Sequence, residues 1–282
     1  MQAMVVQQRQ RRRGRRSGAV ALVAAGVVAA TVSGCSGPAD ASPGVDAAAA
    51  AAAVRGAPDA LVRAGTSKAR TSMEMATGGT RVTIRGEGAY DFSRWQGRLK
   101  VVLPKDAAGT SGHRPITELL APGALYMKNR GAGVPADKWV RVDTTSLADG
   151  NLVTGGATDP AAAAELLRGA RRVSYVGEEE LAGVPVTHYR GVTDLARAAR
   201  EASPQVRGAL AAAAKGFAMD AVPFDVYLDR EGRLRKVRHR FSFTNQGRTV
   251  AVASTTLLYG FGVPVVVQLP PHRDIYAGKV GA

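Results

Sequence analysis

The chain has 282 residues, a formal net charge of +15 and a single cysteine, Cys35. One cysteine excludes a disulfide within the chain, so the fold must depend on its apolar core. The 6 Phe, 2 Trp and 7 Tyr residues are few and are not interleaved with basic residues, which argues against nucleic-acid binding.

The first 34 residues have the three consecutive parts of a secretory signal. Six arginines lie between Arg9 and Arg16, and residues 18–32 then form an uncharged stretch that is shorter than the roughly 20 residues of a membrane-spanning helix. Cys35 follows Val32, Ser33 and Gly34, a set that resembles the lipobox of bacterial lipoproteins. We therefore expect residues 1–34 to be a lipoprotein signal peptide and Cys35 to carry the lipid; the alternative is a chance cysteine near an uncleaved signal anchor.

Loss of this signal changes the charge of the mature chain. Of the 38 Lys and Arg residues, six precede Cys35, which leaves 32 against 23 acidic residues and a net charge of +9. Anionic lipid surfaces or envelope polymers are the expected partners of this excess. Residues 35–55 are interpreted as a disordered tether, and residues 56–282 as one domain held on the outer face of the cytoplasmic membrane, facing the cell wall.

Apolar periodicity predicts the elements of this domain. A short helix is expected over 58–70, and strands follow over 71–75, 80–92, 98–103, 116–120, 124–128 and 138–142. A helix over 159–169, strands over 171–177 and 184–190, and a helix over 194–214 broken at Ser203-Pro204 come next. The last strands are expected over 224–228 and 236–243, joined by a turn at 229–232, and over 250–259 and 263–267. This order favours an α+β fold with one large antiparallel sheet, because a parallel doubly wound sheet needs regular alternation of strands and helices.

Alternation within the strands points one set of apolar side chains to the inner face of the sheet. The candidate ligand-cavity residues are Met73, Met75, Val82, Ile84, Phe224, Val226, Leu228, Phe241 and Phe243. The helices either fill this face as an ordinary core or leave a cavity for an acyl chain, in which methionine side chains repack easily around different ligands.

No residue pattern predicts catalysis, a metal site or a cofactor. The histidines, His113, His188, His239 and His272, lie in no recognisable catalytic or metal motif, and His239 has the parity of a core or rim residue. The basic set Arg233, Arg235, Lys236, Arg238 and Arg240 either meets anionic headgroups or is an ordinary solvated sheet face. An enzyme is kept only as a remaining hypothesis.

Several segments together resemble the actinobacterial lipoproteins of the LppX, LprA, LprF and LprG type, whose domain is related to the carriers LolA and LolB. These segments are 125–128 with 138–142, 182–191, 224–237, and 259–264 ahead of 269–271. The resemblance implies a half-barrel, a large curved antiparallel sheet with helices covering the concave face, and an apolar cavity that binds lipids or acylated glycolipids for carriage through the envelope. This chain departs from the pattern because its long helical segment is rich in Ala. The resulting expectation is a membrane-anchored, non-enzymatic lipoprotein with a lipid or glycolipid ligand; the alternative is an envelope interaction or scaffolding lipoprotein with a filled core.

Overall fold

The computed structural model describes residues 46–77, 79–104, 114–130, 133–154, 158–217, 221–245 and 248–278. The expected signal peptide, the lipobox residues Val32, Ser33 and Gly34, and Cys35 lie outside the described residues. Their processing and lipidation therefore stay predictions.

The first helix, α1, extends over Ala47–Ala64 and corrects two expectations. It begins at Ala47 and not at residue 58, and residues 66–70 belong to a strand. The Asp46 side chain accepts a hydrogen bond from the Ala48 N–H at 3.0 Å, and alanine has the highest helix propensity of all residues. Ala50 and Val54 are fully buried, so the part of the expected tether from 47 to 55 belongs to the packed domain.

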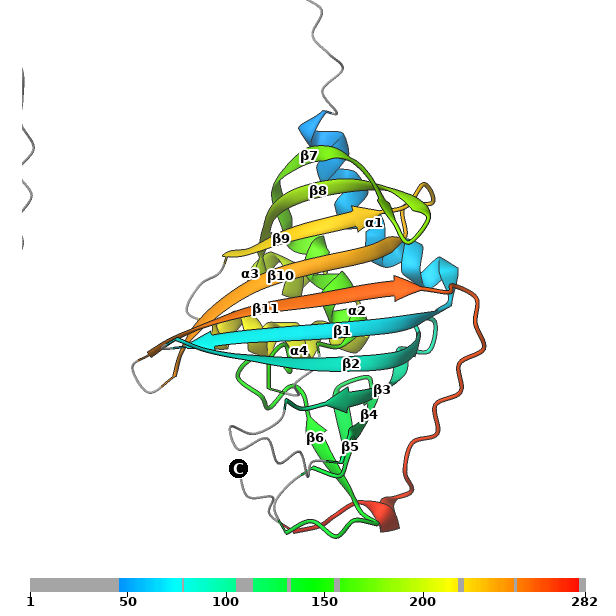
Figure 1. The fold of residues 1–282 in the computed structure, drawn as a ribbon, viewed down its shortest axis with the longest axis vertical. Coiled ribbons are helices and arrows are strands. Elements are labelled where there is room, and N and C mark those ends of the chain that lie inside the picture. The colour runs from blue at the N-terminus through cyan, green and yellow to red at the C-terminus, as the bar shows by residue number, and fades with distance from the viewer. Residues whose placement is uncertain are drawn as a thin grey trace, which may run out of the picture. The chain divides into compact units, whose positions relative to one another are not determined.

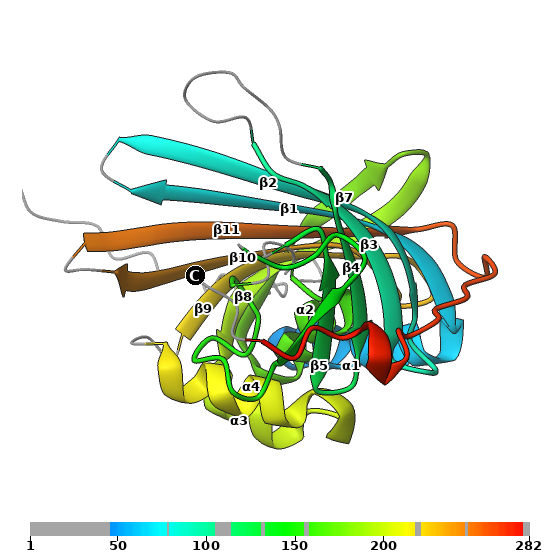
Figure 2. The ribbon, with the colours of Figure 1, turned by 90° about the horizontal axis from the view of Figure 1, so that it is seen from below.

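An open sheet of 11 antiparallel strands forms the body of the fold. The strands are β1 (Thr66–Thr77), β2 (Thr80–Asp91), β3 (Gln96–Val102), β4 (Ile116–Ala121), β5 (Ala124–Lys128), β6 (Trp139–Asp143), β7 (Ala170–Leu181), β8 (Val184–Asp194), β9 (Ala221–Leu228), β10 (Leu234–Asn245) and β11 (Arg248–Tyr259). Their spatial order is β6-β5-β4-β3-β2-β1-β11-β10-β9-β8-β7, so pairing of β1 with β11 joins the two halves of the chain. Figures 1 and 2 show that the sheet is curved and that the helices lie on its concave side. The α+β class with a half-barrel sheet is confirmed.

Three short helices complete the helical layer. These are α2 (Pro160–Glu165), which continues into the 3-10 turn η1 (Leu166–Gly169), α3 (Leu195–Glu201) and α4 (Pro204–Gly216). The Asp159 and Asp194 side chains cap α2 and α3 by accepting hydrogen bonds from the N–H groups of Ala161 and Arg197, each at 2.8 Å. The expected break at Ser203-Pro204 separates α3 from α4 because proline cannot donate a helical hydrogen bond.

After β11 the chain leaves the sheet, which makes the expected strand over 263–267 wrong. Pro264, Pro270 and Pro271 remove backbone donors that a ladder needs. The segment continues to a short 3-10 turn, η2 (His272–Asp274), and reaches the edge strand β6, where the Tyr276 N–H donates to the Trp139 carbonyl at 2.8 Å. One edge of the sheet is thus partly covered by the chain itself.

Candidate functional site

The strand register brings the predicted apolar residues to the concave face, hereafter the inner face. Phe241 lies opposite Val252, which lies opposite Met75, and Met75 lies opposite Val82. The next row contains Met73, opposite Ile84. On β9, Phe224, Val226 and Leu228 lie opposite His239, Val237 and Leu234 of β10.

Most of these predicted side chains are covered. Met73, Ile84, Phe224, Val226, Leu228 and Phe241 are buried, and Met75 and Val82 are partly buried against the same core. The side chain of Phe243 lies outside the described residues. Contact of any of these residues with a ligand stays a prediction.

Helices rich in alanine cover the inner face. Both α1 and α2 contact β10, and α1 also contacts β1 and β9. The buried residues of α2 include Ala161, Ala162, Ala163 and Ala164, whose methyl groups reach only a short distance from the helix axis. At the end of α4, Phe217 stacks on Phe241 with ring centroids 5.4 Å apart. The cover therefore combines one aromatic contact with many short side chains.

Polar side chains also lie on this inner face; the sequence analysis placed only His239 among core or rim residues and missed the others. On this face, the buried side-chain atoms with no hydrogen-bond partner among the described residues are Ser67 Oγ, Thr71 Oγ1, Glu118 Oε1 and Oε2, His239 Nε2 and Thr256 Oγ1. Thr71 and Thr256 lie directly opposite each other on β1 and β11, and His239 is adjacent on β10, opposite Ser254. Their parity with Met73, Leu258 and Phe241 was the signal in the sequence that could have identified them.

Ser254 of the same face does have a partner. Its hydroxyl lies 2.6 Å from that of Thr158, which donates to the Leu152 carbonyl at 2.9 Å. The Ser254 hydroxyl therefore has a hydrogen-bond partner, whereas its polar neighbours on the inner face have none among the described residues. Since proteins pair nearly all buried polar groups, these positions are places where water or a ligand can form hydrogen bonds.

Burial shifts the pKa of three ionisable groups at the inner face. Burial, helped by the charge of Arg240, lowers the pKa of His239 to about 3, so its imidazole is neutral at pH 7. Burial raises the pKa of Glu118 to about 8; Arg130 opposes this shift and Asp159 adds to it. Burial also raises the pKa of Asp159 to about 6, against the hydrogen bonds from the backbone of Ala161 and from the Tyr90 hydroxyl. Near neutral pH the His239 and Glu118 side chains are therefore uncharged, whereas the Asp159 carboxylate at the start of α2 is largely ionised.

Ion pairs tie the helical layer together beside this face. The Glu165 carboxylate is 1% exposed and accepts from Arg168 Nε at 2.8 Å and from the Ser203 N–H at 2.8 Å. Arg168 Nη2 also donates to Asp59 of α1 at 2.7 Å. Because α1, η1 and the start of α4 share this network, the helices form one cover rather than separate pieces.

His188 lies on the opposite face of the sheet from His239. On the outer, convex face, His188 lies between two carboxylates, with Nδ1 2.9 Å from Glu179 Oε1 and Nε2 3.0 Å from Asp225 Oδ1. Its ring stacks on Tyr227 with centroids 4.3 Å apart. His113 lies outside the described residues, and His272 is exposed in η2. Within the described residues no group of three or more His, Cys, Asp and Glu could hold a metal ion.

Most of the predicted basic set is neutralised by carboxylates. Arg240 pairs with Asp225 at 2.6 Å, Arg238 with Glu74 at 3.5 Å, and Arg233 and Arg235 both reach Asp229, at 2.9 and 3.7 Å. Burial tends to raise the pKa of Asp225, but its hydrogen bonds from Arg240, Arg190 and His188 lower that pKa to about 2. Lys236 lies over the Tyr227 ring at 4.7 Å. This half of the outer face is a paired, solvated surface.

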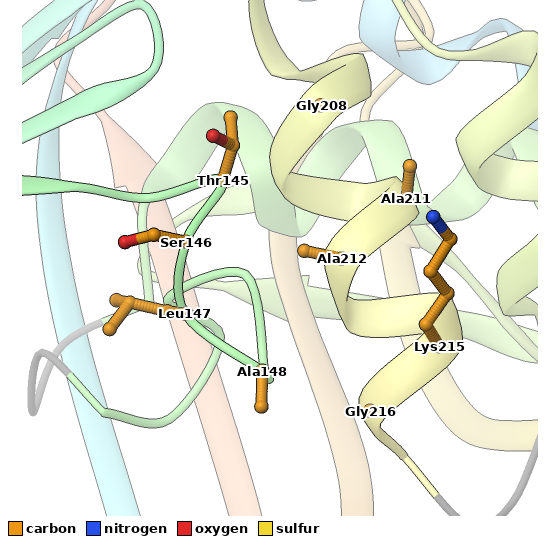
Figure 3. Close-up of a pocket in the computed structure, with 9 residues that line it drawn as sticks. All are labelled: Thr145, Ser146, Leu147, Ala148, Gly208, Ala211, Ala212, Lys215 and Gly216. Atoms are coloured by element: carbon orange, nitrogen blue, oxygen red, sulfur yellow. The ribbon is translucent and has the colours of Figure 1, made fainter.

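A surface pocket of about 350 Å³ lies between α4 and the loop after β6 (Figure 3). Thr145, Ser146 and Ala148 line one side, and Ala212 and Lys215 line the other. None of the predicted cavity residues contributes to it, so this pocket is separate from the inner face.

Comparisons with solved structures find several proteins to which this chain is similar. It resembles the crystal structure of Mycobacterium tuberculosis lipoprotein LppX, with 12% identity, a TM-score of 0.46, and coverage of 78% of this chain and 99% of LppX. It also resembles LprF from Mycobacterium bovis, with 14% identity, a TM-score of 0.39, and coverage of 78% of this chain and 96% of LprF. For the LolA-superfamily protein NE2245 from Nitrosomonas europaea, the identity is 10% and the TM-score 0.34, with coverage of 76% of this chain and 94% of NE2245. No protein-family model and no curated protein matches the sequence.

None of the described helices combines the length and the hydropathy of a segment that crosses a bilayer.

Proposed function

We propose that this protein is a non-enzymatic lipoprotein, anchored through Cys35, that holds a lipid or another hydrophobic ligand between the inner face and the helices. The anchor is supported by the sole cysteine at the end of the lipobox-like sequence Val32-Ser33-Gly34-Cys35. Two acyl chains on this cysteine would hold the protein at the membrane far more firmly than one. The site would then face the cell wall from the outer surface of the cytoplasmic membrane.

The observation that carries the ligand proposal is the group of buried polar atoms without partners on the inner face. Leaving such an atom buried and unpaired costs about 1–3 kcal/mol, so three neighbouring cases at Thr71, Thr256 and His239 favour an occupant that offers hydrogen bonds. The same face carries Met73, Ile84 and Phe241, which suit an apolar chain. A ligand with an alkyl part and an uncharged polar group, such as an ester or hydroxyl, satisfies both sets of residues.

A specific observation favours the second candidate, an envelope interaction or scaffolding lipoprotein with a filled core. Six of the predicted cavity residues are buried by the protein's own atoms. In that case ordered water would satisfy the polar atoms, and no lipid would copurify.

Mass spectrometry of organic extracts tests the ligand proposal. The protein carrying Cys35→Ser is purified from cells, so that covalent lipid is absent, and bound lipid is measured. Stoichiometric lipid is expected, and Ile84→Trp should displace it, whereas Val176→Trp on the exposed part of β7 should not. Protein that contains no lipid and exchanges none with vesicles would support the filled-core alternative.

The anchor is tested separately by the intact mass of the mature protein and by cell fractionation. Lipid mass on residue 35 and loss of membrane association in Cys35→Ser are expected. An unmodified mature chain, or a Cys35→Ser chain that stays in the membrane fraction, would contradict the anchor.

A further inference from the structure

An exposed group of cations lies on the outer face of β1–β3, away from the paired half described above. This basic patch consists of Lys68, Arg70, Arg85, Arg98 and Lys100. The strand register puts Lys68 in one row with Arg98, puts Arg70 in the next row with Lys100, and places Arg85 beside Val102 in the third. With three strands about 4.8 Å apart and three rows about 7 Å apart, the patch measures roughly 10 by 14 Å.

The patch has little negative charge to balance it. Glu87 lies between Arg70 and Lys100 and is its one carboxylate, so the three rows carry a net charge of +4. Glu87 is engaged by Arg70 at 3.1 Å and by the Tyr259 hydroxyl at 3.2 Å. No ion pair is formed by the other four cations with any residue in the described ranges.

Apolar and aromatic side chains accompany these cations. Val102 and Leu257 are 51% and 37% exposed on the same outer face, beside Arg85 and Arg70. The basic character continues onto β5 and β6, where Lys128 lies 5.5 Å from the Trp139 ring and Arg141 lies 6.0 Å from the Tyr126 ring. Cations next to exposed apolar and aromatic groups are typical of surfaces that lie at a membrane interface.

We infer that the outer face of β1–β3 docks directly on an anionic lipid surface through the basic patch. Phosphate groups of the bilayer neutralise the four unpaired cations, and Val102 and Leu257 enter the headgroup region. A linear anionic polymer offers charge but no apolar layer for these two side chains. The inner face and its helices are on the opposite side of the sheet and stay uncovered (Figures 1 and 2).

Cosedimentation with vesicles tests this docking without using the lipid anchor. Every protein carries Cys35→Ser and keeps the six N-terminal arginines between Arg9 and Arg16, so these arginines contribute equally to vesicle binding in all variants. The patch variant is Lys68→Gln/Arg85→Gln/Arg98→Gln/Lys100→Gln. The control removes four exposed cations elsewhere, by Arg63→Gln/Arg200→Gln/Lys215→Gln/Arg230→Gln.

On vesicles of phosphatidylcholine with one third phosphatidylglycerol at about 0.05 M salt, the patch variant should bind at least about tenfold more weakly than the control. Circular dichroism checks that both variants are folded. Equal weakening of both variants would overturn the inference, because net charge alone would then explain binding. Absence of vesicle binding together with binding to a soluble polyphosphate would overturn it in favour of a polymer partner.

A second measurement locates the contact. An environment-sensitive fluorophore is attached to Val102→Cys, or to Val176→Cys on β7, each in the Cys35→Ser chain. A blue shift with anionic vesicles is expected at position 102 and not at 176, and the reverse pattern or no difference would refute the proposed orientation. These results do not depend on lipidation of Cys35 or on a ligand at the inner face.

Discussion

The protonated carboxyl group of Glu118 on the inner face is tested directly by the substitution Glu118→Gln. The side chain is fully buried on β4, and neither carboxylate oxygen has a hydrogen-bond partner among the described residues. Its pKa is raised from 4.5 to about 8, so the folded state binds this proton more tightly than the unfolded chain does. The stability that comes from the protonated form is complete below pH 4.5 and is lost as the pH rises toward 8.

The size of the effect follows from the shift in pKa. At about 1.4 kcal/mol for each unit between 4.5 and about 8, the loss amounts to about 5 kcal/mol at most. Glutamine has nearly the same volume and stays uncharged at every pH, so Glu118→Gln removes this loss. The variant should be similar to the parent protein at pH 5 and several kcal/mol more stable at pH 8.5, by about the amount above.

Urea denaturation of both proteins at intervals between pH 5 and pH 8.5 measures this difference. Glu180→Gln, on the exposed part of β7, is the matched control and should leave the dependence on pH unchanged. Parallel stability curves for the parent and Glu118→Gln would refute the reasoning, because Glu118 would then have the same proton affinity in both states.

Three further predictions concern stability. His239, with its pKa lowered from 6.5 to about 3, contributes stability above pH 6.5 that is lost as the pH falls toward 3. The substitution His239→Phe should therefore make the Tm less dependent on pH between pH 6.5 and 4. If the Tm of the variant fell with pH as steeply as that of the parent protein, a buried neutral imidazole would be contradicted. Arg168→Met leaves the carboxylate of Glu165 buried without its cation and should lower the free energy of unfolding, measured by thermal denaturation, by about 3–5 kcal/mol. Adding Glu165→Gln to this variant should restore part of the lost stability. Gly88→Ala places a methyl group against the Arg98 carbonyl oxygen and should cost about 1–3 kcal/mol, whereas Gly177→Ala, with open space around it, should cost little.

Alternating side chains made the sheet predictable. Phe224, Val226 and Leu228 share one parity, and the tight turn after Leu228 fixes how β10 pairs with β9. The proline after Ser203 was enough to predict the break between α3 and α4. These features are local, so the sequence alone carries them.

Features that depend on distant pairing were not predictable. The alanine run from Ala47 lacks large apolar residues and has no periodicity of its own, yet it forms the first turns of α1, in which Ala50 and Val54 are buried against the domain. Thr71 and Thr256 are far apart in the chain and meet only because β1 pairs with β11. Likewise, the sequence does not distinguish Arg240 from Arg98, but only Arg240 has a carboxylate, that of Asp225, on a neighbouring strand.

A high-resolution crystal structure of the protein purified without added lipid tests the central claim most directly. The account predicts elongated density between the inner face and helices α1 and α2, with a polar atom within hydrogen-bond distance of Thr71 or Thr256. A dry, closely packed interior, or ordered water alone at these two hydroxyls, would contradict it.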